Sequence, residues 1–447
     1  MPYLLVPHSL LRPGQAVVWV GVVKESGNLP NLTLQSNAGM HPLGPWKTLI
    51  GQSNGFRLDY QRVTIDTLQA GAPYRFLLMA HGQVLADCQL RTLPAQLPTL
   101  GEPEFIVLLA SCFCSARDEG GTLGQTFTQL PGAERPNIKI LSGDQVYLDD
   151  PATHFLWHTH TRAELEEEHF ANYLRTWTQT GLAGGFQQVL KDGANYFSSD
   201  DHEFWNNAPS WASFVRDSWS AQGRANWMAA ARSLYNAFQT EEAVTQFNVG
   251  TLSFFIADTR INRDEQRQQF MTSNDLAALK RWISNLQGLG VLVIGQPVLS
   301  DRAGWSGKLT DWNLPDYQQY QELVQALTQA TRSIIILTGD VHYGRVASCQ
   351  LRPDVELIEI ISSPTALVNK LVGGKWNAAP KRFPAFDVPG AVQTGVRTDL
   401  NFTLTDNHFL TLGFSSVGTR TRVVVKAWPI ARNGKSVNSI FVMERIL

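Results

Sequence analysis

Residues that can do chemistry recur at one kind of place in this sequence, directly after short apolar segments typical of buried strands. In layered α/β folds the loops at the carboxyl ends of the strands converge, and ligands bind there. Cys, Asp, His and Tyr side chains gathered at such ends are the donor set of a metal site, because carboxylates suit hard cations while thiolates and imidazoles suit softer ones. The residues that follow the six segments are Cys112, Asp144 with Tyr147, Asp200–Glu203, Asp258 with Arg260, Gln296, and Asp340 with His342.

The chemistry that such a mixed donor set indicates is hydrolysis. Metal ions lower the pKa of a bound water and hold the oxygens of an in-line phosphoryl displacement, and a nearby histidine can protonate the leaving group. A single Gly-Asp pair after a strand is more typical of a turn, since glycine adopts positive φ and aspartate caps helices. Two such pairs, Gly143-Asp144 and Gly339-Asp340, together with the acidic run 200–203, favour the metal site.

A histidine-rich segment, 154–160, is interpreted differently. His154 and His158 have the spacing of one helix face, and His160 follows closely. No carboxylate-bearing strand end accompanies them, so we expect a solvated loop or helix face, with a role at the edge of the metal site as the alternative. The acidic run 166–168 is likewise expected to be the exposed face of its helix.

The N-terminal part of the chain has the pattern of an all-β domain. Short segments rich in β-branched and aromatic residues, among them 15–23, 56–65 and 73–81, are separated by turn sequences. We therefore expect residues 1–97 to form a small β-sandwich domain. A proline-rich linker follows it.

In residues 98–447 compact apolar strands alternate with helices, a pattern typical of an α/β layered domain. The capping sequences Thr161-x-x-Glu164 and Thr272-x-x-Asp275 predict the starts of two helices. A third helix is expected over 316–330, and the last fifty or so residues return to strands.

Composition excludes several classes of protein. The 447 residues include 37 Lys and Arg against 39 Asp and Glu, a net charge of −2, which argues against nucleic-acid binding through bulk charge. Four cysteines do not make a disulfide framework in a chain of this length. The apolar runs are too short to span a membrane, and the N-terminus lacks the basic start of a signal peptide, so we expect a soluble, cytoplasmic protein.

The motifs at these strand ends resemble those of the PhoD-like alkaline phosphatases, within the calcineurin-like metallophosphoesterases. The resemblance covers most of the chain and implies a four-layer αββα metallophosphoesterase sandwich preceded by a small N-terminal β-sandwich. The motifs are ASC at 110–112, GDQVYLD at 143–149, DDHEFWNN at 200–207, ADTRINR at 257–263, IGQPVL at 294–299 and TGDVH at 338–342.

The resemblance also implies roles for individual residues. Cys112 would ligate an iron ion, Asp144 would bridge it to a second metal, and His202 would be the general acid. The further metal ligands it implies are Asp201, Asp340 and His342, with Tyr147 and Asn206 or Asn207 as candidates. The implied cofactors are Fe³⁺ with Ca²⁺, and Mn²⁺, Mg²⁺ or Zn²⁺ are alternatives.

Two positions depart from the family pattern. Phe113 stands after the cysteine where the family has Gln, and Ser199 stands where it has Trp. A closer match to the first motif, Ala347–Gln350, falls inside a predicted strand and is interpreted as a coincidence. These departures leave the ligands in place and bear on substrate preference and on the identity of the metal.

These observations predict a metal-dependent phosphoesterase that hydrolyses small phosphate mono- or diesters through a metal-activated hydroxide. Arg260, Arg117 and Arg345 are candidates to stabilise the developing charge or to bind the substrate. The alternatives are a nuclease or cyclic-nucleotide phosphodiesterase on the same site, or a binding protein with a vestigial site. The sequence predicts neither the oligomeric state nor the natural substrate.

Overall fold

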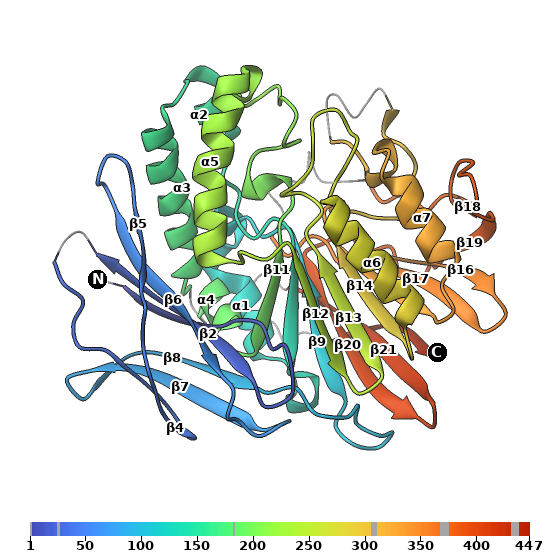
Figure 1. Ribbon diagram of the computed structural model, residues 1–447, viewed down its shortest axis with the longest axis horizontal. Helices are drawn as coiled ribbons and strands as arrows, with labels where there is room; N and C mark the ends of the chain where they lie inside the picture. The colour runs from blue at the N-terminus through green and yellow to red at the C-terminus, as the bar shows by residue number, and fades with distance from the viewer. Residues whose placement is uncertain (1, 25–26, 182–183, 305–310, 367–374, 431–437) are drawn as a thin grey trace.

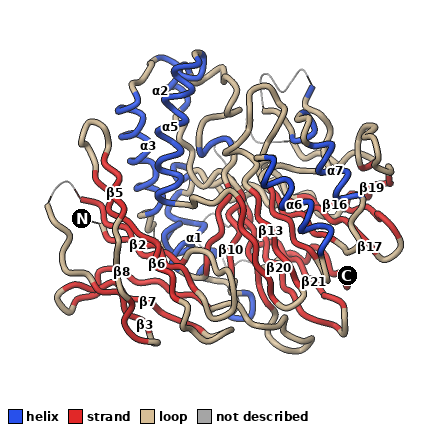
Figure 2. Tube along the Cα trace, in the orientation of Figure 1, coloured by secondary structure: helices blue, strands red, loops and turns tan. Residues whose placement is uncertain are grey.

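Most of the chain is described by a computed structural model, which covers residues 2–24, 27–181, 184–304, 311–366, 375–430 and 438–447 (Figure 1). The described strands form two four-stranded sheets from the N-terminal part and two larger sheets from the rest of the chain (Figure 2). Helices cover the outer faces of the larger sheets (Figure 1).

The two N-terminal sheets pack against each other through their apolar faces. The first has the order β1-β2-β6-β5 and the second β4-β3-β7-β8. One apolar cluster joins Val18 and Val20 of the first sheet to Phe76 and Leu78 of the second. The strands are β1 (Tyr3–Pro7), β2 (Ala16–Lys24), β3 (Thr33–Ser36), β4 (Gly39–His41), β5 (Lys47–Ile50), β6 (Arg57–Ile65), β7 (Pro73–Ala80) and β8 (Gln83–Arg91).

The first large sheet has the order β11-β10-β9-β20-β21-β22. Its strands β9, β10 and β11 run parallel, so their carboxyl ends meet at one edge. The strands are β9 (Phe105–Ala110), β10 (Ile138–Ser142), β11 (Ala194–Ser198), β20 (His408–Val417), β21 (Arg420–Pro429) and β22 (Ile440–Ile446).

The second large sheet has the order β12-β13-β14-β15-β17-β16-β19-β18. Its central strands β13, β14, β15 and β17 are parallel, and β16 joins them antiparallel. The strands are β12 (Val244–Val249), β13 (Leu252–Ala257), β14 (Gly290–Ile294), β15 (Ile334–Thr338), β16 (Arg345–Arg352), β17 (Val355–Ile361), β18 (Arg382–Phe383) and β19 (Thr394–Thr398).

Alternate residues of the parallel strands face opposite layers. In β15, Ile335 and Leu337 belong to the core between the two large sheets, while Ile334 and Ile336 pack against helices. The predicted four-layer αββα arrangement is therefore confirmed. On one side lie α1 (Thr122–Thr128), α2 (Ala152–Trp157), α3 (Arg162–Trp177), α4 (Gly185–Lys191) and α5 (Ala221–Phe238), and on the other lie α6 (Ser273–Asn285) and α7 (Tyr320–Thr328) (Figure 1).

The predicted helix starts are confirmed at both capping sequences. Thr161 caps α3 and exchanges hydrogen bonds with Glu164, and the Thr272 side chain accepts from the Asp275 amide at the start of α6. The third predicted helix is shorter than expected, because residues 314–316 form a separate 3₁₀ turn before α7 begins.

The N-terminal sheets dock on the helical layer. The Trp19 indole of β2 donates to the Ala237 carbonyl at 2.8 Å, and the Gln52 amide donates to the buried Glu166 carboxylate of α3 at 3.0 Å. All nine residues of β2 are buried, because one face packs on the second N-terminal sheet and the other faces α5. The division of the chain at residue 97 stays a prediction.

None of the described helices is long and apolar enough to cross a membrane.

Candidate metal centre

The carboxyl ends of parallel strands from both large sheets bring together the residues singled out in the sequence. We call this group the strand-end centre; it comprises Cys112, Asp144, Tyr147, Asp200, Asp201, Asn207, Asp340 and His342. Five of these residues have positive φ, between 56° and 67°: Cys112, Asp144, Asn207, Asp340 and His342. A positive φ is uncommon outside glycine and is concentrated at functional sites. We infer that the backbone of these loops adopts it because it places the ligand side chains in the centre.

Glycine allows the neighbouring strand ends to approach closely. Gly143 has φ 87°, and a Cβ on it would lie 2.6 Å from the Asp200 Cβ. A Cβ on Gly339 would lie 2.4 Å from the Ser111 side chain. A residue larger than glycine at either position would push apart the loops that carry the ligands, so the two Gly-Asp pairs do more than form turns.

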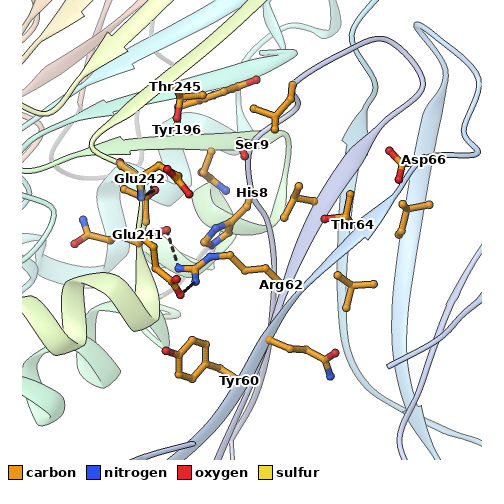
Figure 3. A pocket seen from close by; sticks show the side chains of 18 of the residues that line it. His8, Ser9, Tyr60, Arg62, Thr64, Asp66, Tyr196, Glu241, Glu242 and Thr245 are labelled. Carbon is orange, nitrogen blue, oxygen red and sulfur yellow. Dashed lines mark hydrogen bonds and ion pairs between the residues drawn. The ribbon is translucent and has the colours of Figure 1, made fainter. Parts of the chain in front are cut away.

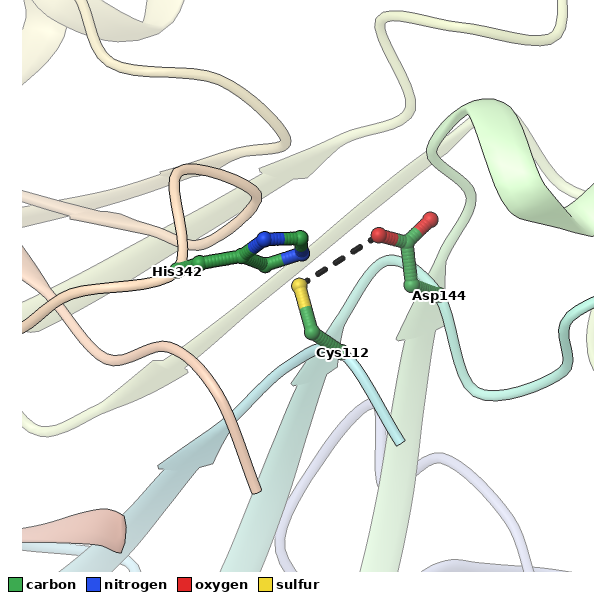
Figure 4. Close-up of side chains that lie close together, drawn as sticks. All are labelled: Cys112, Asp144 and His342. Atoms are coloured by element: carbon green, nitrogen blue, oxygen red, sulfur yellow. Dashed lines mark hydrogen bonds between the residues drawn. The ribbon is translucent and has the colours of Figure 1, made fainter. Parts of the chain in front are cut away.

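Cys112, Asp144 and His342 form one group of ligand atoms (Figure 4). The Cys112 thiol lies 3.3 Å from Asp144 Oδ2, and the three ligand atoms lie within 4.8 Å of one another. Burial raises the pKa of the Cys112 thiol to about 12, and Asp340 adds to this. A nearby cation would favour the thiolate instead.

Carboxylates form the rest of the strand-end centre. Asp144, Asp201 and His202 make a second group of ligand atoms, and Asp200, Asp201 and Asp340 make a third. Burial, followed by the neighbouring negative charges, raises the pKa values of Asp144 and Asp340 well above the usual range. Such crowding of buried acids is electrostatically unfavourable without a cation. A bound metal ion would relieve the repulsion.

Several buried polar atoms of the strand-end centre have no hydrogen-bond partner among the residues that the structure describes. They are the Tyr147 hydroxyl, Asn207 Oδ1 and Asp200 Oδ2. Buried polar atoms are nearly always paired, so three unpaired oxygens beside a thiol and an imidazole fit metal ligands. The residues present therefore fit both a softer ion near Cys112 and His342 and a harder ion near the carboxylates.

The strand-end centre is less deeply buried on one side. Cys112, Asp144, Tyr147, Asp201 and Asn207 are buried and form its floor. Asp340 and His342 are only partly buried, as is the neighbouring His202. A ligand can therefore reach the centre from the side of these three residues.

His202 stands beside the centre in a fixed orientation. Its Nδ1 lies 2.7 Å from Asp149 Oδ1, and its ring stacks on Tyr147 with the centroids 4.2 Å apart. Burial alone would lower the pKa of His202, but Asp149, Asp201 and Asp144 raise it well above the usual range. These contacts fix the imidazole beside the centre, and the raised pKa favours its protonated form.

Three residues that the sequence marked only as following strands, with no role predicted for them, position the ligands. Glu203 accepts hydrogen bonds from the backbone amides of Asp144, Gln145 and Asp200, at 2.6–2.8 Å, and so joins the loops after β10 and β11. Asp258 accepts from the amide and hydroxyl of Ser199. Gln296 donates to Asp340 Oδ2 at 3.0 Å.

The three arginines predicted to act on substrate lie in different environments. Arg260 is buried, with its Nε 2.6 Å from Asp200 Oδ1 and its Nη atoms bound to Asp311. Arg345 is buried and paired with Glu359 at 2.6 Å. Arg117 is exposed, in the turn that follows Cys114. Arg260 is therefore placed to hold Asp200 in position. Of the three arginines, only Arg117 is exposed.

The two departures from the family pattern have local explanations. Phe113 stacks on Phe186 of α4 with centroids 4.3 Å apart, so it anchors the loop in the helical layer. Ser199 is small enough to bind Asp258 with both its amide and its hydroxyl. Cys349, in the second match to the first motif, lies in the core beneath α6 and α7, in agreement with the interpretation as a coincidence.

The expectation that residues 166–168 form an exposed face is wrong at Glu166. Its side chain is buried, accepts from the Gln52 amide and pairs with Arg162 at 2.9 Å. The expectation of a solvated surface is also wrong for His160, whose side chain is 6% exposed and bound to Asp217 at 2.7 Å. Both polar side chains are buried because they have fixed partners.

A large groove lies elsewhere, between the N-terminal sheets and the rest of the chain (Figure 3). Its lining includes His8, Arg62, Tyr196 and Glu241, and Arg62 pairs with Glu241 at 2.9 Å. No residue of this groove belongs to a metal-capable group found among the described residues. The groove is therefore distinct from the strand-end centre.

No model of a known protein family and no curated protein matches the chain. Among solved structures, one of a glycosyl hydrolase family 2 member from Bacteroides cellulosilyticus matches at 8% identity over 97% of this chain and 68% of that chain, with a TM-score of 0.21, too low to bear on the fold. A structure of PhoD matches at 14% identity, covers 98% of this chain and 88% of that chain, and gives a TM-score of 0.65. The chain thus has a PhoD-like fold, as its motifs predicted.

Proposed function

We propose that the protein is a metal-dependent phosphoesterase that hydrolyses small phosphate mono- or diesters at the strand-end centre. The observation that carries this proposal is the set of unpaired buried oxygens of Tyr147, Asn207 and Asp200 beside Cys112 and His342, on a fold like that of PhoD. Metal ions held there would lower the pKa of a bound water and stabilise charge on the phosphoryl oxygens.

The ligands divide by chemical softness. Cys112, His342 and Tyr147 suit Fe³⁺, with Asp144 shared between two ions, while Asp201, Asp340 and Asn207 offer oxygens that suit Ca²⁺. Mn²⁺, Mg²⁺ or Zn²⁺ would satisfy parts of the same set. Ser363 joins two of these residues, because its hydroxyl lies 3.1 Å from Cys112 Sγ and accepts from the His342 amide, also at 3.1 Å.

His202 is proposed as the general acid. Its Nδ1 is occupied by Asp149, which leaves Nε2 as the ring nitrogen for the leaving-group oxygen. Asp149 also accepts from the Asn206 amide at 2.8 Å, so the carboxylate that orients His202 is itself fixed. Such a fixed pair can transfer a proton to the departing alkoxide without first reorganising.

Elemental analysis of the purified protein, paired with hydrolysis of mono- and bis-p-nitrophenyl phosphate, tests the proposal. We expect near-stoichiometric iron and calcium with turnover, and the ratio of the two rates distinguishes a phosphatase from a phosphodiesterase. Hydrolysis of polynucleotides with a steep salt dependence would support the nuclease instead. A stable protein that holds no metal and has no activity after iron and calcium are added would contradict the proposal.

The variant Cys112→Ser tests the identity of the softer ion. Serine keeps the size of the side chain and removes the thiolate, so iron content should fall more than calcium content. Cys114→Ser is the matched control, because Cys114 is a buried thiol two residues away that packs with Cys112 and Tyr147 but belongs to no metal-capable group of the described residues, and its sulfur lies 3.9 Å from Asp150. Unchanged iron in Cys112→Ser would remove the thiolate from the ligand set.

A further inference from the structure

A second group of ligand atoms lies outside the strand-end centre, on the helical layer. His154 in α2, His160 just before α3 and Glu168 within α3 bring their side chains together. We call these three residues the histidine cluster. The sequence did not predict it, because Glu168 comes from a helix and not from a strand end.

The spacing of the three ligand atoms matches that around a tetrahedral ion. His154 Nε2 lies 3.0 Å from Glu168 Oε1 and 3.3 Å from His160 Nε2, and His160 Nε2 lies 4.0 Å from Glu168 Oε1. Ligands bound to zinc at about 2.0–2.1 Å in a tetrahedron lie roughly 3.3 Å from one another. The cluster therefore forms one face of such a tetrahedron with little movement of its side chains.

A buried carboxylate fixes the ring of His160. Asp217 Oδ2 lies 2.7 Å from His160 Nδ1, and Asp217 Oδ1 accepts from the His160 amide at 2.8 Å. When the His160 proton is on Nδ1, where Asp217 accepts it, Nε2 is unprotonated and its lone pair faces His154 and Glu168. A carboxylate behind a ligating histidine is the usual support of a metal-bound imidazole.

The atoms of the cluster are poorly matched to one another in the absence of an ion. With the His160 proton on Nδ1, two acceptors, His160 Nε2 and Glu168 Oε1, face one nitrogen, His154 Nε2. A neutral His154 has a single proton to offer there, so one acceptor stays unsatisfied. A cation at the centre of the three atoms would satisfy all of them.

We propose that the histidine cluster is a binding site for a divalent transition-metal ion, with zinc as the ion of choice. Two imidazoles and one carboxylate suit zinc better than calcium or magnesium, which prefer oxygen ligands. Water can fill the fourth position, and His158, whose ring centroid lies 5.6 Å from that of His154, is a further imidazole close to the cluster. The side chains of His154 and Glu168 are 41% and 38% exposed, so an ion can enter from solvent.

The ion would join three segments that otherwise meet through side-chain contacts. It would bind α2, the residues that lead into α3, and α3 itself, with Asp217 of the turn at 216–219 behind it. Helix α2 begins three residues after Asp149, which orients His202. The ion therefore stabilises the segment that lies between the strand-end centre and the helical layer.

Zinc binding by the full chain tests this site. The protein is stripped with a chelator and titrated with Zn²⁺ alone, and bound zinc is counted after dialysis for the wild type, Glu168→Gln and His154→Asn. Because the strand-end centre is intact in all three proteins, the wild type should retain one equivalent more than either variant. The control is Glu167→Gln, which removes the same charge from the next residue and should keep that equivalent.

A second measurement separates the cluster from the strand-end centre. In an Asp144→Asn background, Zn²⁺ should raise the thermal midpoint by more when Glu168 is present than with Glu168→Gln. In crystals soaked with zinc, an anomalous difference peak should lie between His154, His160 and Glu168. Equal zinc equivalents in the wild type and both variants, or an equal loss in Glu167→Gln, would overturn the proposal.

Discussion

The strand-end centre and the histidine cluster present similar ligand atoms in opposite settings. In the strand-end centre most ligands are buried, five have positive φ, and oxygens of Tyr147 and Asn207 have no partner in the described part of the chain. In the histidine cluster His154 and Glu168 are about two-fifths exposed, and each ligand atom already contacts another polar group. The difference teaches that the first site leaves buried charges unbalanced without a cation, whereas in the second site solvent can reach the acceptor that stays unsatisfied.

The strongest test of this contrast is Asp144→Asn. The change keeps the size of a buried side chain and removes the charge that two ions would share. We expect turnover to fall by about 10³-fold or more, because a metal ion stabilises the transition state by several kcal/mol. The measurement is kcat for p-nitrophenyl esters together with metal content. Turnover like that of the wild type would remove Asp144 from the bridging position.

The variant His202→Ala tests whether His202 acts in proton transfer and not in metal binding. A general acid contributes roughly 10²–10⁴-fold when the leaving group is poor, and little when it is p-nitrophenolate. We therefore expect a large loss on alkyl or phenyl esters, a small loss on p-nitrophenyl esters, and unchanged metal content. An equal loss on both classes of ester would exclude the role of general acid.

The variant Glu203→Gln tests the hydrogen bonds that hold the loops of the strand-end centre in place. Gln keeps one carbonyl oxygen, so it can no longer accept from the Asp144, Gln145 and Asp200 amides at once. Partners behind metal ligands change affinity or activity by about 10–100-fold when mutated, and we expect a loss in that range. Metal affinity, measured by chelator competition, should fall with activity. A loss of activity at unchanged metal affinity would mean that Glu203 acts in another way.

We expect the smallest effect, a change in thermal stability, when the metal is removed from the two sites in turn. Removing metal from the strand-end centre should lower the thermal midpoint more than removing zinc from the histidine cluster, because crowded buried acids are left behind only in the first site. Differential scanning calorimetry on the wild type and Glu168→Gln, each with and without chelator, gives both shifts. A larger shift for the histidine cluster would reverse the comparison.

Much of the fold could be predicted from the sequence, because continuous apolar runs mark strands that are buried on both faces. The five segments at 105–110, 138–141, 252–257, 291–294 and 333–337 all coincide with strands or nearly so. Helix α5 was not predicted, although Ser220 caps it and Trp227, Leu234 and Phe238 are buried along one side. The alanines and polar residues between them weaken the apolar period that identifies a helix.

The ligands of the candidate site could be predicted because Gly-Asp pairs at strand ends are local in sequence. The supporting contacts could not, because they join residues far apart. Glu203 binds the amide of Asp144 from 59 residues away, and Arg260 reaches Asp200 from 60 residues away. A sequence shows that Glu203 and Arg260 can be charged, but only the fold shows that Glu203 accepts from backbone amides and that Arg260 is paired with Asp200 and Asp311.

The docking of the N-terminal sheets has a consequence for any attempt to divide the chain. Arg62 of β6 donates to the carbonyls of Asn236 and Gln239 at the end of α5, and the Gln239 side chain in turn contacts Gln145 and Glu203. A fragment that began at the linker would lose the cation at that helix end and would expose the apolar residues that β2 covers. The two parts are thus interdependent: transferring residues 98–447 to a foreign partner would require residues 1–97 to be carried with them.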